Sequence, residues 1–129
     1  MRKTPKLICI VDDVASVRRA LGRLIRSFGF EVVLFESGRA CLDGTAIDRA
    51  ACLVLDVSMP GMDGFELYRL LQSTGRSVPT VFISAHDDER YRQRARSVGG
   101  VAFLNKPCDE HLLRDAIDEA LVSDVTPGS

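Results

Sequence analysis

The sequence has little that would mark a secreted, membrane-spanning or nucleic-acid-binding protein. Its basic N-terminus leads into a five-residue apolar run, Leu7–Val11, which is too short for a signal-peptide core or a membrane span. The net charge is −1, so no excess of positive charge points to nucleic acid as a partner. No CxxC motif is present, and in the cytosol we expect reduced cysteines. We therefore expect a cytoplasmic protein that contacts neither membrane nor nucleic acid directly, with four reduced cysteines: Cys9, Cys41, Cys52 and Cys108.

What the chain does contain is enough apolar sequence for one folded domain. It has 129 residues, of which 46% are hydrophobic and 27% are charged, a composition typical of a globular protein with a buried core. We expect a single domain over residues 1–129, with its core at about 5–122. Residues 123–129 include Pro127 and Gly128 and are expected to form a disordered tail or the start of a linker.

Five short apolar segments alternate with helix-like segments along the chain. Several are apolar at almost every position, which is typical of strands buried on both faces in a parallel sheet covered by helices. We interpret Cys9 and Cys52, which lie in two of these segments, as small core residues. The predicted strands are Leu7–Val11, Val32–Phe35, Cys52–Leu55, Thr80–Ser84 and Val101–Leu104.

The intervening segments carry helical periodicity. Helices are predicted at Val14–Phe28, at Ser37–Leu42, after an N-cap at Asp63, at Asp87–Val98 and from about Asp109. Gly29 is expected to end the first helix in the left-handed conformation. Apolar faces are predicted for the first, third and fifth helices, formed by Val14, Val17, Leu21, Leu24, Ile25 and Phe28, by Leu67, Leu70 and Leu71, and by Leu112, Leu113, Ala116, Ile117, Ala120 and Leu121. This alternation favours one doubly wound α/β domain.

Polar residues follow the predicted strands at the edge where such a sheet binds ligands. Asp12 and Asp13 follow the first strand, Asp56 the third, Ser84 ends the fourth and Lys106 comes just after the fifth. Crowded carboxylates repel one another, and a hard divalent cation with oxygen ligands resolves that repulsion. A carboxylate in this setting can attack phosphorus and form an acyl phosphate, while the lysine and the serine contact the phosphoryl oxygens.

At this point the sequence resembles the receiver domains of two-component response regulators. The resemblance implies a CheY-like (flavodoxin-like) α/β fold, with a five-stranded parallel sheet of order 2-1-3-4-5 flanked by five helices. Its general style is similar to the FixJ/NarL-like subgroup. The matching segments are Val11-Asp12-Asp13, Leu53 to Gly64 (LVLDVSMPGMDG), Val81-Phe82-Ile83-Ser84-Ala85 and Phe103-Leu104-Asn105-Lys106-Pro107.

The resemblance also implies the roles of the site residues. Asp56 is expected to accept a phosphoryl group from a sensor histidine kinase or a histidine phosphotransfer protein. Mg²⁺ (or Mn²⁺) is expected to bind Asp13, Asp56 and the backbone carbonyl of Ser58, with Asp12 helping through water. Lys106 is expected to pair with the phosphorylated aspartate and to precede a cis peptide bond at the following proline.

Further positions are implied to control switching. Ser84 is expected to move toward the phosphoryl group, and Phe103 is expected to be the aromatic residue that rotates with it. Ser58 and His86 occupy the two positions that tune the lifetime of the phosphate, and the small Ala85 leaves the site open to a donor. The fourth helix, fifth strand and fifth helix are implied to form the surface that contacts the output partner.

Other interpretations compete with the switch. A Mg²⁺-dependent phosphohydrolase with an aspartyl-phosphate intermediate also places carboxylates at strand ends, but usually has Asp-x-Asp after the first strand and a lid. Here Asp12-Asp13 occurs and no length is left for a lid. A degenerate receiver that only binds protein is disfavoured because all five key residues are present. We therefore predict a phosphoacceptor that promotes its own phosphorylation and dephosphorylation and is not classed as an enzyme. A redox role for Cys108 is disfavoured, and the arginines of the fourth helix are interpreted as a solvated face or as part of the partner surface.

Overall fold

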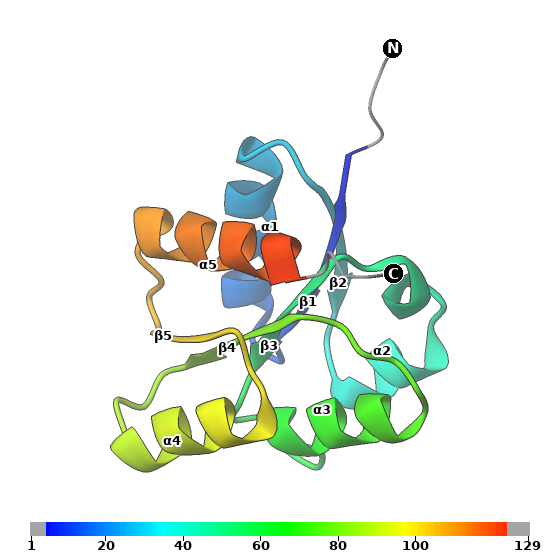
Figure 1. The fold of residues 1–129 in the computed structure, drawn as a ribbon. Helices are drawn as coiled ribbons and strands as arrows, with labels where there is room; N and C mark the ends of the chain where they lie inside the picture. The colour runs from blue at the N-terminus through cyan, green and yellow to red at the C-terminus, as the bar shows by residue number, and fades with distance from the viewer. Residues whose placement is uncertain (1–4, 124–129) are drawn as a thin grey trace.

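Strands and helices alternate along residues 5–123, the part of the chain that the computed structural model describes (Figure 1). The strands are β1 (Leu7–Val11), β2 (Glu31–Phe35), β3 (Cys52–Asp56), β4 (Thr80–Ser84) and β5 (Ala102–Asn105). The helices are α1 (Ala15–Ser27), α2 (Gly38–Asp43), α3 (Gly64–Ser73), α4 (Glu89–Val98) and α5 (Glu110–Ser123), with a short 3₁₀ helix, η1 (Ala46–Arg49), before β3. The predicted tail lies outside the described residues, apart from Ser123, which ends α5.

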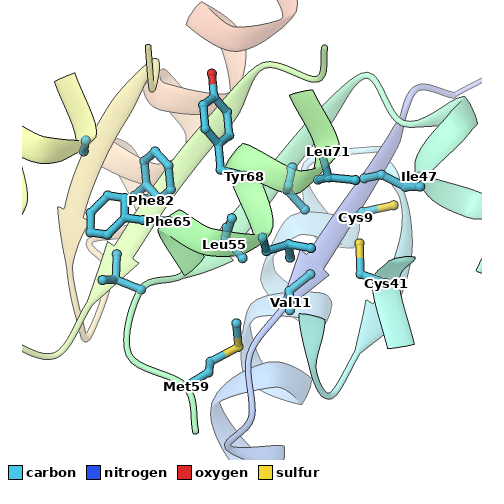
Figure 2. Packing of buried hydrophobic residues seen from close by; sticks show 14 of the residues in the cluster. Cys9, Val11, Cys41, Ile47, Leu55, Met59, Phe65, Tyr68, Leu71 and Phe82 are labelled. Atoms are coloured by element: carbon cyan, nitrogen blue, oxygen red, sulfur yellow. The ribbon is translucent and has the colours of Figure 1, made fainter. Parts of the chain in front are cut away.

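The sheet is parallel throughout, and its strand order is β2-β1-β3-β4-β5, as predicted. Helices α1 and α5 cover one face, and α2, α3 and α4 cover the other (Figure 1). Each central strand therefore contributes to two cores. Ile8 and Ile10 of β1 pack in the cluster that includes α1 and α5, whereas Cys9 and Val11 pack in the cluster that includes α2 and α3 (Figure 2). This explains why the strand segments are apolar without alternation.

The edge strands differ from the central ones. β1, β3 and β4 are buried at every position, but β2 and β5 are mostly half-buried, because each has a neighbouring strand on one side only. β2 begins one residue earlier than predicted because Glu31 pairs with Leu7. β5 lies one residue later than predicted because Asn105 pairs with Ser84. Both end residues are polar, so the apolar content of the sequence does not indicate that they pair with a neighbouring strand.

Three residues that were assigned to predicted apolar helix faces are exposed in the structure. Val14 is the N-cap of α1 and is 45% exposed. Leu70 and Leu112 are 41% and 56% exposed, although both were predicted to face the core. In α5 the buried side chains are Leu113, Ala116, Ile117 and Ala120, and Leu112 lies about 100° around the helix from the first of them.

The predicted helix ends are confirmed where their chemistry is specific. Asp63 caps α3, since its Oδ1 accepts from the Glu66 amide at 2.9 Å, and Glu66 Oε1 accepts from the Asp63 amide at 3.2 Å. Together these bonds form a capping box. Gly29 follows α1 with φ +100°, a conformation that glycine adopts without strain. Within residues 5–123, no helix combines the length and apolar character needed to cross a membrane.

Candidate functional site

Three carboxylates meet at the carboxyl edge of the sheet, as the sequence predicts. Asp12 and Asp13 follow β1, Asp56 ends β3, and these two strands are hydrogen-bonded neighbours. One carboxylate oxygen from each residue lies within 4.8 Å of those of the other two. Asp12 and Asp56 are 0% and 2% exposed, whereas Asp13 lies at the surface. The site therefore has a buried acidic floor and one solvent-facing carboxylate.

The turn after β1 fixes Asp12. Its backbone amide donates to the Phe35 carbonyl at 3.2 Å, which continues the pairing with β2. Its Oδ1 accepts from the Val14 amide at 2.9 Å, just before α1, and its carbonyl accepts from Arg18 Nη1 at 2.8 Å. Backbone and side chain are both anchored, so the second oxygen of Asp12 is held in the site.

Lys106 supplies the positive charge. Its Nζ lies 2.8 Å from Asp12 Oδ2 and 3.3 Å from Asp56 Oδ2, and its side chain is only 14% exposed. Its amide donates to the Ser84 carbonyl at 2.8 Å, which ties the end of β5 to the end of β4. The peptide bond between Lys106 and Pro107 is cis, as predicted. One ammonium thus bridges two buried carboxylates.

Burial makes Asp56 unusually hard to ionise. Loss of solvation, together with the charge of Asp12, raises its pKa to about 6. The ammonium of Lys106 and the Ser58 amide, which donates to Asp56 Oδ1 at 3.3 Å, act in the opposite direction but do not cancel the rise. Burial lowers the pKa of Lys106, but hydrogen bonding to Asp12 and the charges of both aspartates outweigh this effect and raise it.

Gly64 lets α3 start directly against the end of β3. A Cβ at this position would lie 2.4 Å from the carbonyl oxygen of Asp56 and 2.9 Å from Cα of Val57, closer than real side-chain atoms come. The Gly64 amide donates to the Val57 carbonyl at 2.9 Å. The absence of a side chain here allows the start of α3 to lie directly against the backbone of Asp56, a role that the sequence motif alone did not reveal.

The donor set fits a hard divalent cation. All three side chains offer carboxylate oxygens, which Mg²⁺ prefers, and the exposed Asp13 leaves one side open to ligand waters. One ammonium leaves the three acids with an excess of negative charge. Soft-metal ligands are absent from this cluster of described residues.

Comparison with known proteins places this geometry in a family. A family model described as the response regulator receiver domain matches residues 8–118. Nodulation protein W of Bradyrhizobium diazoefficiens is 40% identical over 121 residues, which cover 94% of this chain and 53% of that protein. The structure titled FixJ-N superposes with a TM-score of 0.87 at 31% identity, covering 96% of this chain and 99% of that one. A structure of the response regulator StyR gives a TM-score of 0.85 at 40% identity, with 94% and 61% covered.

The chain belongs to the response regulator receiver family. Receivers of this family are phosphorylation-dependent switches in two-component signalling: they receive phosphate from histidine kinases, regulate output domains and are not generally classed as enzymes. The chain spans about half the length of the curated relatives that it matches, which are covered over 53–55% of their length in the first three cases.

The remaining predicted site residues lie around the receiver's acidic cluster. Ser84 is fully buried at the end of β4, and its Oγ accepts from the His86 amide at 3.0 Å. His86 itself is exposed in the loop before α4, and its ring centroid is 6.2 Å from that of Tyr91. Ser58 is exposed just after Asp56. Phe103 is half-buried in β5.

Two residues of the receiver have connections that the sequence did not suggest. Arg92 was interpreted with the other arginines of α4 as part of a solvated or partner-binding face, and Asn105 was given no role. The structure shows Arg92 Nη2 donating to Asn105 Oδ1, with the arginine also over the Phe103 ring.

Cys108 is half-buried beside the site, and burial raises its pKa to about 11, which disfavours the reactive thiolate.

Proposed function

We propose that Asp56 is the phosphoacceptor of this receiver and that its phosphorylation, supported by Mg²⁺, switches the domain between two conformations. The observation that carries this proposal is the buried carboxylate of Asp56 at the end of a central strand, paired with Lys106 and next to two further aspartates. Among the described residues, Asp12 and Asp56 are the only carboxylates that are both buried and grouped with acids that follow or end a neighbouring strand.

Asp12, Asp13, Asp56 and the backbone carbonyl of Ser58 are the residues that would hold the metal ion. When bound, Mg²⁺ supplies positive charge that offsets the repulsion among the acids and the charge of a phosphoryl group. The chain's own contribution is to fix the oxygens: Asp12 through the Val14 amide, and Asp56 through the Ser58 amide.

In the transfer step, an oxygen of Asp56 attacks phosphorus. The new oxygen–phosphorus bond forms as the nitrogen–phosphorus bond to the donor histidine breaks, and the imidazole leaves with the electron pair. Lys106 already lies 3.3 Å from Asp56 Oδ2, so it can follow the developing charge onto the phosphoryl oxygens. The neighbouring Ala85 has no bulky side chain and is exposed, which leaves room for the donor.

A donor protein would have an apolar surface to pack against beside this site. A groove of about 500 Å³ opens next to Lys106, and its lining is mostly apolar and comes largely from α1. A sensor histidine kinase or histidine phosphotransfer protein that presents its histidine on a helix would suit such a surface. The lining residues are Val14, Val17, Ala20, Leu21, Leu24, Ala85, Lys106, Pro107 and Cys108.

The conformational change at the site would be transmitted to the rest of the domain by Ser84 and Phe103. Movement of the Ser84 hydroxyl toward a phosphoryl oxygen would break its bond to the His86 amide and alter the loop before α4. Phe103 of β5 would change its position in step, and α4, β5 and α5 would form the face that contacts the output partner. Ser58 and His86, both exposed beside the site, would tune how fast water removes the phosphate.

The proposal is tested by incubating the domain with Mg²⁺ and acetyl phosphate. We expect intact mass to rise by one phosphoryl group, and the gain to disappear in Asp56→Asn or when EDTA replaces Mg²⁺. Asp48→Asn is a matched control, because Asp48 lies in η1, away from the acidic cluster, and pairs with Arg76. Sustained turnover of a phosphoester substrate would instead support the phosphohydrolase, and a mass gain that persists in Asp56→Asn would contradict the assignment.

A further inference from the structure

Arg92 of α4 connects three parts of the receiver. Its Nη2 lies 3.0 Å from Asp87 Oδ1, in the loop between β4 and α4, and it also donates to Asn105 Oδ1 at the end of β5. Its guanidinium carbon lies over the Phe103 ring, 5.3 Å from the ring centroid. The side chain is 34% exposed, so these contacts are partly shielded from water. Charge-assisted hydrogen bonds and cation–π contacts both gain strength under such shielding.

Asn105 uses both ends of its amide in this network. Its Oδ1 accepts from Arg92, and its Nδ2 donates to the His86 carbonyl at 3.1 Å. Because one side chain both accepts from α4 and donates to the loop, the loop, the helix and the strand are held together at one point. A carboxylate or an aliphatic side chain at this position could not make both bonds.

The same loop residue, His86, is also bonded to Ser84. The His86 amide donates to Ser84 Oγ at 3.0 Å, and Ser84 is the register partner of Asn105 across β4 and β5. The amide and the carbonyl of His86 are thus fixed from two sides, by Ser84 and by Asn105. An uninterrupted series of contacts therefore runs from the buried serine at the site to Arg92 on the outer face.

We propose that Arg92 is a positioning residue that holds the loop before α4 and the Phe103 ring in the resting state, defined as the arrangement in which Ser84 Oγ accepts from the His86 amide. The inference depends on the proposed roles of Asp56 and Ser84. If Ser84 moves toward a phosphoryl group, the loop loses its bond to the Ser84 hydroxyl and can follow only when Asn105 and Arg92 release it. The ring of Phe103 likewise cannot turn without losing the guanidinium on its face. Arg92 therefore favours the resting state, and anything that favours the switched state has to overcome its contacts.

The test compares Arg92→Ala with Arg94→Ala in the complete chain. Arg94 is a matched control, because it lies on the same helix and also covers an aromatic ring, but its guanidinium carbon is 4.5 Å from the centroid of Phe65 on α3. Beryllofluoride with Mg²⁺ serves as the phosphoryl mimic. Removing a charge-assisted hydrogen bond made only in the resting state should tighten beryllofluoride binding roughly tenfold in Arg92→Ala, with a change below about twofold in Arg94→Ala.

Two further measurements separate positioning from general stabilisation. Amide hydrogen exchange at residues 85–88 of the unliganded chain should be faster in Arg92→Ala than in Arg94→Ala. Arg92→Lys keeps the charge but loses the planar fork, so it should shift beryllofluoride affinity in the same direction by a smaller factor.

Three outcomes would overturn the inference. Unchanged beryllofluoride affinity in Arg92→Ala, even with faster loop exchange, would mean that the contacts persist in both states. Weaker binding would mean that Arg92 favours the switched state. A wild-type chain that neither binds beryllofluoride nor accepts phosphate would overturn the proposed function and this inference together. If the wild type does both and Arg92→Ala binds beryllofluoride with unchanged affinity, the inference alone is overturned.

Discussion

Asp56→Asn is expected to stabilise the metal-free receiver at neutral pH, although it removes the proposed phosphoacceptor. The pKa of Asp56 is raised from 3.8 to about 6, chiefly by burial and then by the charge of Asp12. Since each pKa unit corresponds to about 1.36 kcal/mol, ionising this carboxylate costs the folded state about 3 kcal/mol at pH 8. The attraction of Lys106 is already included in that raised pKa, and asparagine retains the shape of the neutral acid without the cost of ionisation.

The sign of the pH dependence follows from the same shift. The folded state holds the Asp56 proton more tightly than the unfolded chain does. The contribution of Asp56 to the unfolding free energy therefore falls as pH rises from about 4 to about 6. Above this window the whole cost is present, and below it both states are protonated and the cost vanishes. The asparagine variant lacks this titration. The difference in stability between variant and wild type should therefore grow from near zero at pH 4 to about 3 kcal/mol at pH 8.

Urea unfolding in EDTA across pH 4–8, followed by circular dichroism, measures that difference. Addition of Mg²⁺ supplies the control, because a ligand that binds only the folded state stabilises it by mass action. Mg²⁺ should stabilise wild type more than Asp56→Asn, which lacks one proposed ligand, and so narrow or reverse the gap. A variant that is less stable than wild type in EDTA at pH 8, or a gap independent of pH, would refute the reasoning from burial and charge.

Three other substitutions probe the parts of the structure that hold the site. Lys106→Ala leaves the carboxylates of Asp12 and Asp56 buried without their ammonium, so urea unfolding in EDTA at pH 8 should show a loss of about 3 kcal/mol, and an unchanged midpoint would contradict the pairing. Gly64→Ala forces a methyl group against the Asp56 carbonyl and should cost about 3 kcal/mol by thermal unfolding, whereas wild-type stability would argue against the close approach. Asp63→Ala removes the α3 cap and should cost about 1 kcal/mol in the same assay, with no effect expected if the capping box is not formed in solution.

The position of the site could be predicted from the sequence because it depends on topology. In a parallel sheet, residues that follow neighbouring strands arrive at one edge regardless of how the intervening helices pack. This is why Asp12, Asp56 and Lys106 could be grouped from strand ends alone, and the structure brings them within ion-pairing distance. The cap at Asp63 was also predictable, since capping depends on a few adjacent residues.

Side-chain contacts between distant segments could not be predicted in the same way. Leu70 and Leu112 are apolar and fit the helical period, yet the width of a buried face is decided by the neighbouring elements and not by periodicity. The bond between Arg92 and Asn105 joins α4 to β5 across 13 residues, and nothing in the local sequence of α4 distinguishes Arg92 from its neighbouring arginines. The resemblance implied that Lys106 pairs with the phosphorylated aspartate, whereas the structure pairs it with the carboxylates of both Asp12 and Asp56.

The charges in the site give a physical reason for the proposed roles of a cation and of Ser84. Three carboxylates and one ammonium leave an excess of about two negative charges at neutral pH, and one divalent cation would neutralise this excess. In the proposed transfer, phosphorylation would convert the Asp56 carboxylate into an acyl phosphate that carries about two negative charges in place of one. About one negative charge in excess would therefore return, now on oxygens that project beyond the carboxylate, and Lys106 cannot satisfy all of these oxygens while it also pairs with Asp12. The buried hydroxyl of Ser84 is a neutral donor on the next strand, so the demand for one more hydrogen bond provides a physical reason for it to leave the His86 amide.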